Sequence, residues 1–126
     1  MVELTINEIE AELKHQDSPS ELARFLTLLA SYYSNYLEQM KKIALIKPQR
    51  WLAISLNYFT ELEFDKWKPR EKPLTDKKTD MEWACTKDGQ QEIELDFMLK
   101  RIQKLYSSIN SRLRNLEVEW KMSRSL

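Results

Sequence analysis

Apolar residues in the last third of the sequence recur in alternating steps of four and three, and this spacing constrains the fold more than any other feature. The run consists of Leu95, Leu99, Ile102, Tyr106, Ile109, Leu113, Leu116 and Trp120. This period places every member on one side of an α-helix, as a seam that another helix has to cover. Met98 and Leu105 flank the seam and could serve a second subunit. The spacing therefore predicts a long C-terminal helix over residues 90–123.

A matching seam occurs in the first half of the chain. Its members, at the same steps, are Leu22, Leu26, Leu29, Tyr33, Tyr36, Met40 and Ile43. Ser18, Pro19 and Glu21 form a helix-start signal directly before it, since Ser18 can cap free amides and Pro19 suits the first helical position. Two matched seams predict an all-α fold in which two long helices form an antiparallel, coiled-coil-like hairpin. The same seams could instead pair between chains, so we also expect a homo-oligomer.

Shorter elements complete the predicted single domain over residues 1–126. Thr5 and Glu8 form a capping box for a short helix within residues 1–16. The first long arm should span residues 19–64 with a kink near Pro48, because proline removes a backbone donor and clashes with the preceding turn. Residues 65–75 alternate prolines with charges and predict a basic loop. A short helix over residues 76–86, capped at Thr75 or Asp76 and ended by Asp88-Gly89, should precede the last helix.

Composition argues against an enzyme. The single glycine excludes Gly-rich nucleotide loops. His15 is the only histidine and Cys85 the only cysteine, so the usual catalytic triads, thiolate metal clusters and intrachain disulfides have no residues to build them. We expect no catalytic residue, metal or cofactor. The first residues contain acids and no long apolar run, which predicts neither a signal peptide nor a membrane span and favours a cytoplasmic protein.

The charges balance overall but not along the chain. Twenty basic residues face twenty acidic ones, yet positions 41–80 hold ten basic and six acidic residues. Cations interleaved with an exposed aromatic suit single-stranded nucleic acid, since cations bind phosphates and an aromatic ring stacks on any base. The candidate contacts are Lys41, Lys42, Lys47, Arg50, Lys66, Trp67, Lys68, Arg70 and Lys72. The alternative is that these charges only solvate a helical surface.

The order of these parts resembles the phage recombination mediators of the UvsY type. The resemblance covers most of the chain after Ser18 and lies in Tyr32-Tyr33-Ser34-Asn35-Tyr36-Leu37, Leu56-Asn57-Tyr58-Phe59, the polar stretch 73–80, and Ser108-Ile109-Asn110-Ser111-Arg112. The chain departs from the family pattern in two respects. Ala53 and Ser55 stand where basic residues precede the aromatic doublet, and Glu61 stands where a glycine follows it. No DNA-contacting residue is therefore transferred from the family.

The resemblance implies a nonenzymatic, homo-oligomeric protein that binds single-stranded DNA. Such a protein helps to load a recombinase onto strands coated by single-strand-binding protein, and both of those proteins are implied partners. A ring of hairpins would multiply a weak local basic patch. The competing hypothesis is a helical-hairpin adaptor, such as a phage assembly or regulatory factor, that binds protein and no DNA. Salt dependence separates the two, because phosphate contacts weaken steeply with ionic strength.

Overall fold

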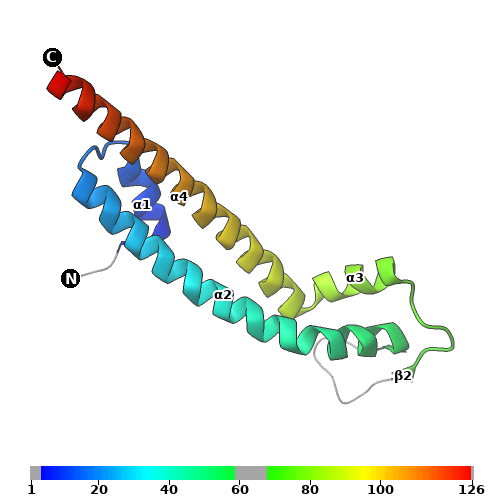
Figure 1. Cartoon of the computed structure of the whole chain (residues 1–126). Coiled ribbons are helices and arrows are strands. Elements are labelled where there is room, and N and C mark those ends of the chain that lie inside the picture. Colours follow the sequence, from blue (N-terminus) through cyan, green and yellow to red (C-terminus); the bar gives the residue numbers. More distant parts are fainter. Residues whose placement is uncertain (1–3, 59–67, 126) are drawn as a thin grey trace. The chain divides into compact units, whose positions relative to one another are not determined.

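The computed structural model describes residues 4–58 and 68–125 and confirms the all-α fold (Figure 1). The helices of this part of the chain are α1 (Ile6–Leu13), α2 (Pro19–Leu56), α3 (Asp76–Cys85) and α4 (Lys87–Ser125). A two-residue strand β1 (Asn57–Tyr58) pairs antiparallel with β2 (Lys68–Pro69). The chain divides into two compact units, of which unit 1 comprises Met1–Tyr36 with Met98–Leu126 and unit 2 comprises Leu37–Phe97. The long helices α2 and α4 contribute to both.

Unit 1 is built around an apolar core from three helices. Its buried members are Ile6, Ile9, Leu22, Phe25, Leu29, Ile102, Leu105 and Ile109. The stretches of α2 and α4 in this unit lie along each other as predicted, and α1 adds two isoleucines to the same core. The capping box of α1 also forms, since the Glu8 amide donates to the Thr5 hydroxyl at 3.2 Å. Burial of this apolar surface is the main source of stability in unit 1.

The predicted α4 seam is confirmed in part. Leu99, Ile102 and Ile109 are buried, and Leu113 and Leu116 are half-buried. The prediction is wrong for Tyr106 and Trp120, whose side chains are 39% and 58% exposed.

Two physical reasons account for these errors. Helix α1 packs beside the hairpin and turns the buried face of α4 toward Leu105, which is 8% exposed. Trp120 lies past the part of α4 that α2 can cover, because the first buried residue of α2 is Leu22 and the last α4 residues packed on this core are Leu113 and Leu116. The indole of Trp120 instead lies under the guanidinium of Arg124, 4.6 Å from the ring centre.

Polar contacts hold α1 in unit 1. Arg101 on α4 donates to Glu10 and to Asn7, each at 2.6 Å. Arg112 on α4 donates to the carbonyl oxygen of Leu13, in the last turn of α1. The Tyr32 hydroxyl on α2 donates to the Leu4 carbonyl at 2.7 Å. Both long helices therefore supply partners for the short one.

Helix α2 runs through Pro48 without ending, so the first long arm is one helix as far as Leu56. The missing donor of Pro48 removes one backbone hydrogen bond. Its neighbours are held on both sides, because Lys47 pairs with Glu92, Arg50 pairs with Asp88, and Ile54 is buried. The chain stays helical across the proline, and the burial of Ile54 anchors the residues that follow it.

The first long helix ends at Leu56 and not at residue 64 as predicted. A segment beyond β2 satisfies its last carbonyl groups. The Arg70 side chain donates from Nε to the carbonyl oxygens of Ile54 and Asn57, at 3.2 and 3.1 Å, and the Arg70 amide donates to that of Leu56 at 2.8 Å. A cation is favourable at this end of a helix, where the carbonyl dipoles point. Residues 59–64, which we also predicted to be helical, lie outside the described residues.

The predicted basic loop is only partly within the described chain. Residues 65–67 lie outside it, whereas Lys68–Pro69 form β2 with the register Asn57↔Pro69 and Tyr58↔Lys68. This pairing corrects the expectation that the whole stretch lacks regular structure. Proline is tolerated in such a short edge strand because no further strand needs its missing donor.

The single glycine has a different role from the one predicted. Helix α3 begins after the Thr75 cap as expected, but it ends at Cys85, and Gly89 lies in the first turn of α4. A Cβ atom at Gly89 would overlap the carbonyl oxygen of Trp83, so only glycine permits this close approach of α4 to α3.

Thr86 joins the two helices. Its hydroxyl donates to the carbonyl oxygen of Trp83 at 2.6 Å and accepts from the Gly89 amide at 3.0 Å. One residue thereby caps the end of α3 and the start of α4. The connection predicted to hold an Asp-Gly turn is a direct helix-to-helix junction.

Candidate nucleic-acid interface

The nine predicted nucleic-acid contacts all belong to unit 2, but the structure divides them into different environments. Lys41 and Lys42 on α2 and Lys72 after β2 have exposed side chains. None of these three makes a hydrogen bond or ion pair to the described part of the chain. The side chains of Lys66, Trp67 and Lys68 lie outside the described residues. Exposed lysines without an internal counter-charge are suited to phosphate contact.

Lys47 and Arg50 lie on the face of α2 that α4 covers, and each pairs with a carboxylate of α4. The Lys47 ammonium lies 3.1 Å from Oε1 of Glu92, and the Arg50 guanidinium contacts Asp88. Residue numbers rise on α2 as they fall on α4, so the two pairs form consecutive rungs of an antiparallel ladder. The sequence had assigned Asp88 only to the end of the short helix before α4. We define these four residues as the ion-pair ladder.

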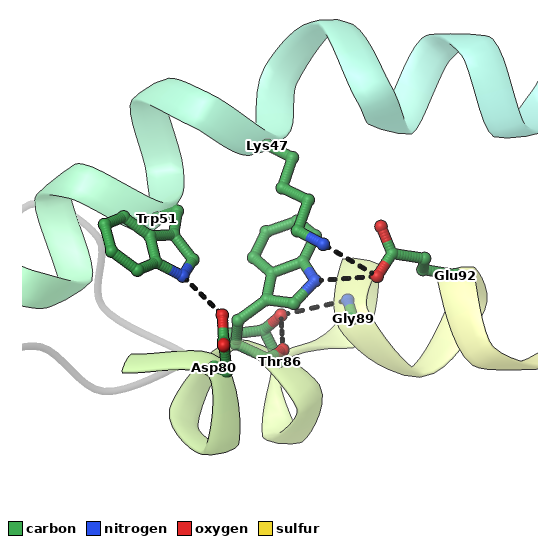
Figure 2. A network of polar contacts seen from close by, with 7 residues as sticks. Lys47, Trp51, Asp80, Thr86, Gly89 and Glu92 are labelled. Carbon is green, nitrogen blue, oxygen red and sulfur yellow. Dashed lines mark hydrogen bonds and ion pairs between the residues drawn. The ribbon is translucent and has the colours of Figure 1, made fainter. Parts of the chain in front are cut away.

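Two tryptophans extend the ion-pair ladder into a wider polar network (Figure 2). The same Glu92 oxygen that binds Lys47 accepts the indole N–H of Trp83 at 3.2 Å. Trp83 is 3% exposed, and the Lys47 ammonium lies 5.6 Å from the centre of its ring. The indole N–H of Trp51 donates to Asp80 on α3 at 2.8 Å. These contacts fasten α3 and the start of α4 to α2.

Arg70 is a structural residue. Its side chain is 8% exposed, and besides the carbonyls at the end of α2 it binds Glu82 on α3 at 3.0 Å. A guanidinium enclosed in this way has its donors committed to the fold. The prediction placed it among the nucleic-acid contacts, and the structure places it in the cap of α2.

The outer face of unit 2 carries apolar side chains as well as lysines. Ile43 is buried, and Leu45 lies about 200° from it around the helix, since each residue advances the helix by about 100°. Leu45 is 80% exposed and Leu52 is 54% exposed on this outer face of α2. Phe97 on α4 is 66% exposed. Exposed apolar surface of this kind is typical of sites that bind protein.

The described residues contain no candidate metal cluster. His15 and Cys85 are exposed and belong to different units. Within residues 4–58 and 68–125, no group of three His, Cys, Asp or Glu side chains could hold a metal ion. The helices of the same residues include none that is long and apolar enough to cross a bilayer.

Comparison with known proteins gives no relative from which a role could be taken. No protein-family model, no curated protein and no solved structure matches this chain.

Proposed function

We propose that this protein is a nonenzymatic accessory protein of phage or prophage recombination that binds single-stranded DNA as a homo-oligomer. The observation that carries the proposal is that the predicted contacts Lys41, Lys42 and Lys72 are exposed and pair with no acid in the described part of the chain. The UvsY-type resemblance and the all-α fold also support the proposal. By that resemblance, the partners are a recombinase and a single-strand-binding protein.

The mechanism needs no bound cofactor. Each lysine that neutralises a phosphate releases a counterion from the strand, and this release drives binding without regard to base sequence. Trp67, by its place in the sequence between Lys66 and Lys68, supplies an aromatic ring for stacking. A few contacts per chain become effective when several chains hold one strand, because the second contact is then intramolecular. A protein of zero net charge can bind DNA in this way.

The test compares two variants of unit 2, each of which removes the charges of two neighbouring lysines. Lys41→Gln with Lys42→Gln removes the candidate contacts on α2, and Lys77→Gln with Lys78→Gln removes an equal charge from exposed positions on α3. Affinity for a fluorescent oligothymidylate is measured as a function of salt. Loss of two phosphate contacts should reduce the salt slope by about 1.4, at roughly 0.7 per contact on single strands. An equal loss in both variants would contradict a role for α2.

A second function is favoured by the exposed apolar side chains of unit 2. Leu45, Leu52 and Phe97 would serve an adaptor that binds another protein. That function predicts no binding of oligothymidylate at low salt, and an affinity for the protein partner that changes little with ionic strength.

A further inference from the structure

The ion-pair ladder differs from the other charged contacts of unit 2 in how its charges are exposed. The side chains of Lys47 and Arg50 are 36% and 44% exposed, whereas those of their partners Glu92 and Asp88 are 27% and 24% exposed. The cations therefore form the outer rim of each pair, within reach of a ligand. Arg70, at 8% exposure and with two backbone carbonyls as partners, has no such access.

We propose that Lys47 and Arg50 are a second phosphate-binding pair, whose positive charges are masked by the carboxylates of Glu92 and Asp88. These two carboxylates restrain the affinity of unit 2 for single-stranded nucleic acid. The inference rests on the proposed function. A phosphodiester would have to compete with a carboxylate already in contact with each cation, so the ladder acts as an internal competitor for the strand.

The ladder is suited to this competition because its pairs are partly solvated. Ion pairs of this exposure contribute little to folding, since solvent and salt screen the attraction. The buried apolar residues Ile43, Ile54 and Leu95 still hold unit 2 when the carboxylates are neutralised, and a glutamine at position 92 can still accept the Trp83 indole N–H. The cations can therefore change partner without loss of the fold.

The amide analogues of the two acids provide a direct test. Glu92→Gln leaves an oxygen to accept the Trp83 indole N–H, and Asp88→Asn keeps the shape of its partner, but both remove the negative charge. The matched control is Glu82→Gln with Glu94→Gln, which changes the net charge equally. Glu82 faces the enclosed Arg70, and Glu94 is exposed and pairs with no described residue.

The readout is the affinity for fluorescent oligothymidylate over a range of salt concentrations, with mass by light scattering and helicity by circular dichroism. The unmasked Lys47 should steepen the salt slope by about 0.7, and Arg50 should add less than that because it makes a further contact besides Asp88, so affinity should rise several-fold near physiological ionic strength. The control should change affinity by less than about twofold, as expected for a general charge effect. Equal gains in both variants would overturn the inference, because net charge alone would then explain them.

A second pair of variants keeps the inference testable if the amide variant fails to fold. Lys47→Gln with Arg50→Gln, made in the wild-type chain, should leave the affinity for oligothymidylate almost unchanged because masked cations contribute nothing to it. A loss of several-fold would show that these cations already bind phosphate and would overturn the masking. If wild type binds and the amide variant gains nothing, the inference fails and the proposed function stands. If no variant binds at low salt, both fail.

Discussion

The two units use the same pair of long helices in different ways. In unit 1 the hairpin buries a continuous apolar core and is covered by α1, with Ile9, Phe25 and Ile109 fully buried. In the described part of unit 2 only Ile43, Ile54, Trp83 and Leu95 form the buried apolar set, and polar contacts fasten α3 and the start of α4 to α2. This difference indicates that the apolar core of unit 1 supplies more of the stability than the described contacts of unit 2. Unit 2 displays charge and apolar surface to the solvent.

The largest effect is expected from a charge placed in the core of unit 1. Ile109→Asp buries a carboxylate without a partner, which should destabilise the protein by about 4 kcal/mol or more. The measurement is urea denaturation followed by circular dichroism. Tyr106→Asp, three residues earlier on α4 and 39% exposed in the wild type, is the control and should cost far less. Equal losses would contradict the buried face described for α4.

Gly89→Ala should give the largest effect in unit 2. The added methyl group meets the Trp83 carbonyl and forces α3 away from α4, at a cost of about 3 kcal/mol for overpacking that cannot relax. Chemical denaturation measures the loss, and tryptophan fluorescence is weighted toward this unit because it contains Trp51 and Trp83, with Trp120 of unit 1 as a constant background. Gln91→Ala, at an exposed position of the same helix, should be close to neutral.

Arg70→Met should destabilise unit 2 by about 2 kcal/mol, because the end of α2 loses charge-assisted hydrogen bonds to two carbonyl groups. The measurement is hydrogen exchange at the amides of residues 53–58. Exchange there should be faster in the variant than in the wild type, while exchange in the helices of unit 1 stays the same. Lys72→Met serves as the control, since Lys72 is exposed. Unchanged exchange in the Arg70 variant would mean that the cap contributes nothing to the end of the helix.

The smallest effect should come from the ion-pair ladder. A double-mutant cycle with Lys47→Met and Glu92→Gln should give a coupling energy of about 1 kcal/mol or less, because both groups are about a third exposed and screened by solvent. The coupling should shrink as salt is added. A coupling of several kcal/mol that is insensitive to salt would contradict the view of the ladder as a replaceable contact.

Periodicity was enough to predict the all-α class and the two long helices. Local capping signals also predicted Thr5 and Thr75 correctly, because a cap depends on residues three positions away. Tyr106 was assigned to the seam because the spacing cannot reveal a third helix that turns the buried face toward Leu105. The end of α2 was missed for a similar reason, since Arg70 caps it from fourteen residues beyond Leu56.

The sequence identified the cations of the candidate interface, but it could not show which of them are exposed and which are paired with an acid. Lys41 and Lys47 look alike in the sequence, and only the pairing of α2 with α4 shows that one is exposed and the other neutralised by Glu92. Once an antiparallel hairpin is assumed, the ladder could have been found by aligning basic residues of the first helix with acidic residues of the last. Arg70 offers no comparable signal, because its role depends on the return of the chain through β2.

The measurement that tests the central claim most directly is mapping of the sites where bound oligothymidylate crosslinks to the protein under ultraviolet light. Mass spectrometry of the digested complex locates each adduct. The claim that unit 2 binds the strand predicts adducts within Leu37–Phe97 and their loss at high salt. Adducts confined to the apolar-cored unit 1, or no adduct at low salt, would contradict it.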